Sequence, residues 1–266
     1  MIIPCYKCDL TLGRAISSIV SQSIPPSEVI VVIDGDGGEN IDEVLLQAKK
    51  LLDSKGIRLK VLRLPHNVGP GAARNRGWEQ AEEDYVAFLD ADDAWHPEKL
   101  AKQVTLMISR RMSFSAHNIS VMNSEEQVPP ELVPRSIPIK RVPAWKLLLA
   151  NRFSTPTVVL SRSLKHRFKE KGLAEDYYLW LKLALSGTEM YFLDVDLAFL
   201  FKERWGEGGM SARLWRMQKG ELDTLWRLSR ERFYPGVLFP VLAIWSLVKF
   251  GRRLVVWTLK RIFARL

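Results

Sequence analysis

The stretch that most constrains the fold is a short apolar run that ends in three carboxylates. Residues 85–89 are Tyr-Val-Ala-Phe-Leu, and Asp90, Asp92 and Asp93 follow directly. An apolar run of this length with aromatic residues predicts a β-strand that is buried on both faces. Ligands of open α/β sheets bind at the carboxyl ends of such strands. We therefore expect the three acids to lie at a binding edge of a sheet.

Two interpretations of this acidic cluster compete. Neighbouring carboxylates repel one another, and a hard cation such as Mg²⁺ or Mn²⁺, shared with a substrate diphosphate, commonly relieves the repulsion. Alternatively, the acids form a solvated turn in which Asp92 or Asp93 caps a helix that begins near Pro97. The stretch alone does not decide between them, because short acidic motifs occur widely.

The rest of the chain indicates an α/β fold. Strands are expected at 1–5, 28–33, 57–64 and 85–89, and helices at 12–20, 41–52, 68–81 and 97–109. Such alternation predicts a mainly parallel, twisted sheet covered by helices on both faces, with 57–64 nearer an edge. Beyond Arg111 we expect strands at 112–122, 157–160 and 190–201, helices at 142–150 and 175–185, and a proline-rich loop at 124–138.

The positive charge of the chain is concentrated at its C-terminal end. Residues 200–266 hold 14 Lys and Arg against 5 Asp and Glu, whereas residues 1–199 hold 25 of each. This asymmetry indicates an acidic partner, which is phosphate, nucleic acid or an anionic membrane.

The composition of this end favours a membrane surface. Residues 237–248 are almost wholly apolar, but roughly twelve residues are fewer than the roughly twenty that span a bilayer, and Pro240 weakens a single helix there. Basic residues between Trp, Phe and Leu suit a helix that lies in the headgroup region. The alternatives are a helix packed on the catalytic domain, an oligomer contact, or a transmembrane hairpin, which would bury arginines at high cost.

The two cysteines predict no disulfide framework. Cys5 and Cys8 have the spacing of half a zinc site or of a redox pair, but there is no second cysteine pair and the four histidines are scattered. The start of the chain, Met1-Ile2-Ile3-Pro4, lacks the basic residues of a signal peptide, and we therefore expect a cytosolic protein.

Several short motifs each allow a structural and a functional interpretation. The glycine-rich stretch 69–74 ends in Arg74, which would suit a diphosphate, although simple close packing of small residues also explains it. Asp34 either stabilises a turn with the glycines after it or accepts a hydrogen bond from a base or ribose. Tyr6 either packs or stacks on a base. Asp176, after Glu175, either complements a helix dipole or acts as a general base.

Taken together, these motifs resemble family 2 glycosyltransferases. The matching stretches are 2–6, 19–22, 28–35, 67–69, 73–77, 88–95 and 175–177. The resemblance covers residues 1 to about 110 strongly and 150–212 more loosely. It implies a GT-A fold, with a nucleotide-sugar-binding half at 1–110, an acceptor-binding half at 111–212, and a basic amphipathic helical tail at 213–266 that associates with a membrane.

The same resemblance implies roles for individual residues. Pro4, Tyr6 and Asp34 should hold the nucleoside, with Arg74 nearby. Asp92 should ligate Mg²⁺ or Mn²⁺ at the diphosphate, supported by Asp90 and Asp93. Asp176 should be the catalytic base, and Trp205 and Ser211 should belong to a loop that closes over the diphosphate. Two departures are Ile33, where relatives usually carry a first acid before the equivalent of Asp34, and Lys7, where asparagine is usual.

We therefore predict a metal-dependent inverting glycosyltransferase. It would move a sugar from a nucleotide-diphosphate donor to a hydroxyl of a saccharide or lipid-linked acceptor, in cell-surface polysaccharide or glycolipid biosynthesis. The expected location is the cytoplasmic face of an anionic membrane, with no nucleic acid as partner. One alternative is transfer to a polyprenyl phosphate, which is already an anion and needs no base. Another is an inert nucleotide-sugar or membrane-binding adaptor, and a nucleotidyltransferase is a weaker third choice.

Overall fold

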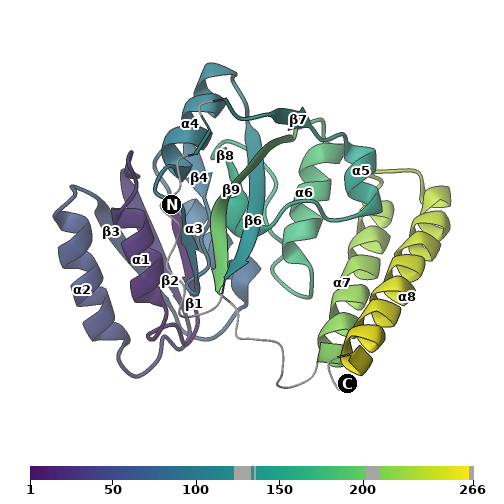
Figure 1. Cartoon of the computed structure of the whole chain (residues 1–266), viewed down its shortest axis with the longest axis horizontal. Coiled ribbons are helices and arrows are strands. Elements are labelled where there is room, and N and C mark those ends of the chain that lie inside the picture. Colours follow the sequence, from purple (N-terminus) through teal and green to yellow (C-terminus); the bar gives the residue numbers. More distant parts are fainter. Residues whose placement is uncertain (123–132, 135, 202–209, 264–266) are drawn as a thin grey trace.

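The computed structural model describes residues 1–122, 133–134, 136–201 and 210–263 (Figure 1). Its strands are β1 Ile2–Cys5, β2 Glu28–Asp34, β3 Arg58–Leu64, β4 Tyr85–Ala87, β5 Asp93–Trp95, β6 Phe114–Met122, β7 Ile139–Arg141, β8 Val159–Ser161 and β9 Tyr191–Phe201. Its α-helices are α1 Leu12–Val20, α2 Ile41–Asp53, α3 Pro70–Glu79, α4 Lys99–Ser109, α5 Ala144–Leu149, α6 Glu175–Leu185, α7 Met210–Arg230 and α8 Phe239–Phe263, with short 3₁₀ turns η1 Thr155–Thr157 and η2 Gly236–Leu238.

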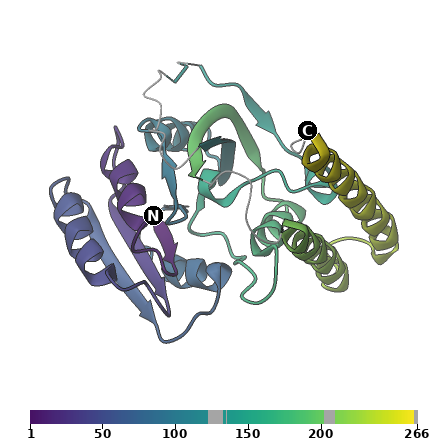
Figure 2. The same cartoon turned by 60° about the horizontal axis from the view of Figure 1, so that its bottom comes forward.

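The N-terminal part is a parallel sheet in the order β1-β2-β3, and β3 is its edge strand, as expected. Every residue of β2 is buried, because successive side chains point to opposite faces and both faces are covered. Val31 packs in the same cluster as residues of α1 and α2, whereas Val32 packs with Ala73 and Trp78 of α3. Strand β2 and its sheet therefore form the middle layer between two helical layers (Figure 2).

The second sheet is mixed rather than parallel throughout. Its order is β4-β8-β6-β9-β5, with β7 paired to β9, and only the β6–β9 pairing is parallel. A parallel bridge between Ile2 and Phe88 connects the two sheets. The α/β fold class and the C-terminal helical extension are confirmed, and the parallel pairings belong mainly to the N-terminal part.

Strand β5 is the main element that the sequence analysis missed. Asp93 pairs with Leu200 of β9 instead of capping a helix. Helix α4 begins at Lys99 and its N-cap position is Glu98, so the expectation of an Asp92 or Asp93 cap near Pro97 is wrong. Three residues are too few for the alternation of apolar and polar side chains that identifies a strand.

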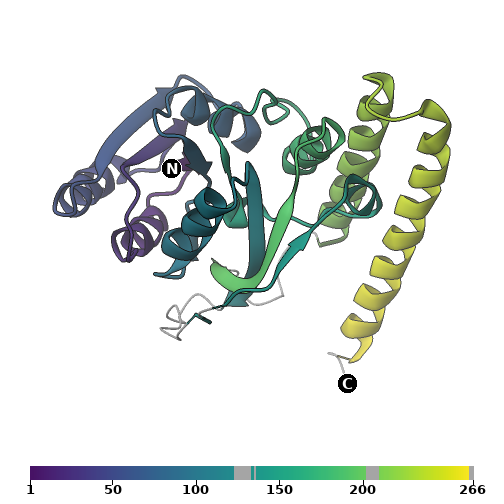
Figure 3. The same ribbon diagram turned by 90° about the horizontal axis from the view of Figure 1, so that it is seen from above.

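The C-terminal extension is a hairpin of two long helices, α7 and α8, which lie side by side in Figures 1 and 3. Leu242, Ser246 and Phe250 form the buried face of α8, and the Gln218 side chain of α7 donates a hydrogen bond of 2.9 Å to Ser246 Oγ. Pro240 does not interrupt α8, because it occupies the first turn, where its missing N–H needs no partner. Among the helices in the described ranges, none combines the length and apolar character needed to cross a membrane.

Candidate active site

Two neighbouring cavities share a wall. The β1 cavity, of about 540 Å³, lies at the carboxyl ends of β1 and β2. The α6 cavity, of about 640 Å³, is lined by the start of α6, by residues between 151 and 156, and by α7 and α8. Arg74 and Asp90 line both cavities. A molecule in one cavity would therefore lie next to a molecule in the other.

The β1 cavity brings together all the residues that the sequence assigned to nucleotide-sugar binding. They are Pro4, Tyr6, Asp34, Arg74, Asp90 and Asp92. Tyr6 is 51% exposed, and the Lys7 ammonium lies 5.7 Å from the centre of its ring. Strand ends that are distant in sequence meet here because the parallel strands share one edge.

Asp34 holds the loop that leads into α3. Its Oδ1 accepts a hydrogen bond of 2.7 Å from the Val68 N–H, and its Oδ2 accepts one of 2.9 Å from the Gly69 N–H. Gly69 has a φ of 92°, in the left-handed region that favours glycine. The backbone partners are thus in the loop after β3, not in the glycines that directly follow Asp34.

Arg74 is buried between two carboxylates. Its guanidinium donates hydrogen bonds of 2.5 Å to Asp90 Oδ1 and 3.3 Å to Glu175 Oε1. Burial alone would lower the pKa of Arg74, but the Asp90 and Glu175 carboxylates outweigh it and raise that pKa above its ordinary value. Its Nε atom is buried and has no hydrogen-bond partner among the described residues. A permanently charged donor with an unused N–H therefore stands between the two cavities.

The three acids of the predicted metal cluster do not lie together. Asp90 and Asp92 line the β1 cavity, whereas Asp93 is 3% exposed within β5. Within the part of the chain that the structure describes, no group of three or more His, Cys, Asp or Glu side chains is placed to hold a metal ion alone. Oxygen ligands from Asp90 and Asp92 nevertheless fit Mg²⁺ or Mn²⁺, which commonly take one or two protein carboxylates and complete their shell with phosphate oxygens and water.

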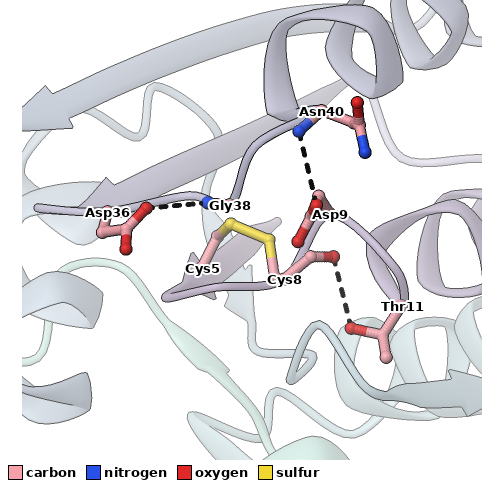
Figure 4. Close-up of a disulfide and its surroundings, with 7 residues drawn as sticks. All are labelled: Cys5, Cys8, Asp9, Thr11, Asp36, Gly38 and Asn40. Atoms are coloured by element: carbon pink, nitrogen blue, oxygen red, sulfur yellow. Dashed lines mark hydrogen bonds between the residues drawn. A yellow bond between two sulfur atoms is a disulfide. The ribbon is translucent and has the colours of Figure 1, made fainter.

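A disulfide between Cys5 and Cys8 forms part of the β1 cavity lining (Figure 4). The sequence implied no disulfide framework and offered half a zinc site or a redox pair for these cysteines, whereas the structure joins them to each other across three residues. The adjacent loop is held by the Cys8 N–H, which donates to the Gly37 carbonyl, and by Asp9, whose carboxylate accepts from the Asn40 N–H. The disulfide thus stabilises the loop that carries Tyr6.

Asp176 lies at the start of α6, on the lining of the α6 cavity. Its Oδ1 accepts a hydrogen bond of 2.6 Å from the Tyr177 N–H, and its Oδ2 accepts one of 3.2 Å from the Asn151 side chain. Burial, reinforced by the neighbouring Glu175 carboxylate, raises the pKa of Asp176 from 3.8 to about 6. Asp176 is therefore a base at neutral pH that protonates readily in mild acid.

Helix α7 fixes the segment before Asp176. The Lys169 ammonium donates to the Leu173 carbonyl at 2.9 Å and to Asp223 of α7 at 2.7 Å. A Cβ atom on Gly220 of α7 would lie only 2.7 Å from Leu173 Cβ, so this glycine allows the close approach. Ala174 has a φ of 56°, an uncommon left-handed conformation for alanine that the surrounding contacts maintain.

The sequence analysis did not identify the wall that the hairpin contributes. Arg216, Met217 and Glu221 of α7 and Arg253 of α8 all line the α6 cavity. The only signal was the excess of positive charge after residue 200. Asn151, which contacts Asp176, gave no signal at all, because a single polar residue in a loop resembles any other.

The predicted closing loop is described only in part. Trp205 lies outside the described residues. Ser211 belongs to the first turn of α7, and only its backbone is described. The assignment of both residues to a loop over the diphosphate stays a prediction.

Comparison with known proteins identifies relatives along most of the chain. The family model described as Glycosyl transferase family 2 matches residues 1–166. The Escherichia coli UDP-Glc:alpha-D-GlcNAc-diphosphoundecaprenol beta-1,3-glucosyltransferase WfgD is 32% identical over 227 residues, which are 85% of this chain and 84% of the relative. The Erwinia amylovora amylovoran biosynthesis glycosyltransferase AmsB is 25% identical over 208 residues, covering 74% of this chain and 67% of the relative.

Solved structures share the fold. The mannosyltransferase PcManGT from Pyrobaculum calidifontis, in complex with GDP-Man and Mn²⁺, has a TM-score of 0.65 and 17% identity, covering 96% of this chain and 73% of that one. Residues 1–349 of S. aureus TarS, in complex with UDP-GlcNAc, have a TM-score of 0.64 and 20% identity, covering 85% and 65%. The fold is GT-A, and the chain belongs to glycosyl transferase family 2 and is a glycosyltransferase.

Proposed function

We propose that this enzyme is a metal-dependent inverting glycosyltransferase that moves a sugar from a nucleoside diphosphate to a hydroxyl of a lipid-linked saccharide. The observation that carries the proposal is the shared wall formed by Arg74 and Asp90 between two cavities. A transferase needs two substrates whose reacting atoms meet, and adjoining cavities supply that arrangement.

The β1 cavity is the donor site in this proposal. Tyr6 stacks on the base, and Arg74, which lines the cavity, places its positive charge near the diphosphate. Oriented positive charge at the departing diphosphate stabilises the transition state, because negative charge grows there as the sugar leaves. A divalent cation held by Asp92 with Asp90 would add the same kind of stabilisation to the diphosphate oxygens.

The α6 cavity is the acceptor site, and Asp176 is its base. A pKa of about 6 leaves the carboxylate ionised at neutral pH, yet basic enough to accept the proton of the attacking hydroxyl. The hydrogen bonds from Tyr177 and Asn151 keep the carboxylate oriented while the proton moves. Attack from this cavity on a sugar held in the other gives inversion at the anomeric carbon.

Two relatives support the acceptor class. WfgD is named as a transferase that acts on GlcNAc linked to diphosphoundecaprenol, and it aligns with 85% of this chain. AmsB is named for amylovoran biosynthesis. By similarity, the acceptor of this enzyme is a saccharide on a polyprenyl diphosphate, and the product belongs to cell-surface polysaccharide synthesis.

The proposal also places α8 on the membrane that carries this acceptor. Val241, Ile244, Val248 and Val255 are exposed and recur along the face of α8 opposite to its contact with α7. Such a stripe beside basic residues suits the headgroup region of an anionic bilayer. The double variant Ile244→Glu, Val248→Glu should lose flotation with anionic liposomes and keep its melting temperature. Flotation equal to that of the unaltered protein would contradict the membrane contact.

The base assignment is tested with Asp176→Asn, which keeps the shape of the side chain and removes its basicity. Turnover should fall at least roughly a hundredfold, while the affinity for the nucleotide donor stays unchanged. Asp53→Asn, on the exposed end of α2, is the matched control and should be fully active. Near-normal turnover of Asp176→Asn would contradict the base and favour a polyprenyl phosphate as the nucleophile, because that acceptor is already ionised.

A further inference from the structure

Two arginines at the α6 cavity have no carboxylate closer than 4.0 Å among the described residues. Arg216 of α7 is exposed on the cavity lining, and no described carboxylate lies within ion-pair distance of it. Arg253 of α8 lines the same cavity, is 37% exposed, and approaches Glu221 only at 4.0 Å. Asp90 and Glu175 in the same lining already pair with Arg74, and Glu221 pairs with Lys249. Two guanidinium groups on one cavity that are at most loosely paired suit an anionic ligand.

The neighbouring charges of the hairpin are already paired. Glu221 accepts a hydrogen bond of 2.5 Å from the Lys249 ammonium, which also donates to the Leu149 carbonyl at the end of α5. Trp245 donates to the same carbonyl at 3.1 Å. This half-buried group joins α5, α7 and α8, so it fixes the backbone that presents the two arginines. Glu221 therefore pairs closely with Lys249 and only loosely, at 4.0 Å, with Arg253.

From this arrangement we propose that Arg216 and Arg253 bind the diphosphate of the acceptor. The inference rests on the proposed function, because it assumes that the α6 cavity receives a saccharide linked to a lipid through a diphosphate. Guanidinium groups suit this ligand, since their planar N–H donors match phosphate oxygens in pairs. The acceptor saccharide then lies deeper in the cavity, next to Asp176.

The apolar face of α8 supports the direction in which the acceptor enters. Arg253 lies on the side of α8 that faces the cavity, and the exposed stripe from Val241 to Val255 lies on the opposite side. A lipid chain that leaves the diphosphate at the arginines reaches the bilayer along this helix. The hairpin would therefore hold the acceptor at its only charged group and leave the saccharide free to reach the donor.

The experiment measures binding and transfer with a water-soluble acceptor, GlcNAc α-linked through a diphosphate to a short alkyl chain, and with an alkyl GlcNAc glycoside that has no phosphate. Full-length protein saturated with UDP is titrated by calorimetry, so that the donor site is occupied. The variants are Arg216→Gln, Arg253→Gln and the double variant. Their matched controls are Lys219→Gln on α7 and Arg252→Gln on α8, which remove the same charge from exposed positions outside the cavity lining.

Each arginine variant should weaken binding of the diphosphate acceptor about tenfold, because charge-assisted hydrogen bonds are lost. The KM for that acceptor should rise by a similar factor, with kcat and the donor KM nearly unchanged. Binding of the phosphate-free glycoside and the behaviour of both control variants should not change. Melting temperatures should stay nearly constant, since Arg216 is exposed and Arg253 is only partly buried, with a loose ion pair at 4.0 Å.

The proposal is overturned if the double variant binds the diphosphate acceptor as the unaltered protein does. It is also overturned if the phosphate-free glycoside loses the same affinity, or if the variants lose only flotation with anionic liposomes. Failure of the proposed function looks different. In that case the unaltered protein transfers no sugar to either acceptor, while calorimetry still decides whether Arg216 and Arg253 bind the diphosphate.

Discussion

The two cavities differ in how the chain builds them. The β1 cavity comes mainly from the ends of consecutive parallel strands between residues 4 and 92, so its residues follow one another in simple order. The α6 cavity gathers side chains from Arg74 to Arg253, carried by helices and loops that are far apart in the sequence. The residues of a site at one sheet edge can therefore be predicted from local sequence patterns. The residues of a site between packed elements cannot, because they come together only through tertiary contacts.

Substitution of Arg74 should have the largest effect, because this residue lines both the β1 cavity and the α6 cavity. Arg74→Met should lower turnover about 100- to 1,000-fold and raise the KM values of both donor and acceptor. Removal of the buried cation also leaves Asp90 and Glu175 without compensation, which should cost about 3 kcal/mol of stability. Steady-state kinetics and urea unfolding measure the two effects.

The control for Arg74 lies on the same helix. Arg76→Met removes an exposed cation that pairs with Glu79 at 3.2 Å, and it should leave activity unchanged. If Arg74→Met changed the KM of only one substrate, the claim that Arg74 acts on the ligands of both cavities would be wrong.

Asp92 should affect the donor side alone. Asp92→Ala should lower the affinity for UDP about 100-fold in the presence of Mn²⁺ and leave metal-free binding unchanged, because the carboxylate would act only through the cation. Acceptor binding should not change. Asp84→Ala, at the exposed start of the same strand region, is the control. Calorimetry that finds equal Mn²⁺-dependent affinity in Asp92→Ala and the unaltered protein would refute the assignment.

Tyr6 should have a smaller effect, also confined to the donor. Tyr6→Ala should raise the donor KM about tenfold, since base–aromatic stacking contributes about 1–3 kcal/mol. Tyr6→Phe keeps the ring and should retain normal kinetics. An equal loss in both variants would show that the hydroxyl, rather than the ring face, matters.

The pKa of Asp176 predicts an effect on stability that is specific to the α6 cavity. Its folded-state pKa of about 6 lies above the ordinary 3.8, so folding favours the protonated form. That contribution is present below about pH 4 and is lost as the pH rises through 6. Asp176→Asn should therefore raise the unfolding free energy by about 1 kcal/mol or more at pH 7 and leave it nearly unchanged at pH 4. Urea unfolding at both pH values checks this, and an equal change at both would contradict it.

Much of the fold and of the β1 cavity was predictable from particular residues. The apolar run before Asp90 and the buried strand that ends in Asp34 mark their strand ends directly, and the family resemblance added Tyr6 and Arg74. The predictions that failed concern residues whose structure depends on contacts with other parts of the chain. Asp93 lies in a three-residue strand whose existence depends on β9, and the Cys5–Cys8 bond depends on how the loop folds back.

The residues of the α6 cavity were also only partly predictable from the sequence. Asp176 was found through its match to a family motif, but its orientation depends on Asn151 and on the Lys169–Asp223 pair. Neither contact leaves a periodic pattern in the sequence. The excess of positive charge predicted an acidic partner for the C-terminal part, but not that Arg216 and Arg253 line a cavity.

The close contact at Gly220 has an evolutionary consequence. The family model ends at residue 166, and the hairpin beyond it contacts the segment before α6 through Gly220 and the Lys169–Asp223 pair. On the proposed roles, recombination or drift in the codons for residues 210–263 can change acceptor preference while donor chemistry is inherited unaltered. A hairpin that carried a larger residue than glycine at position 220 would have to shift relative to Leu173, because a Cβ there would lie 2.7 Å from Leu173 Cβ.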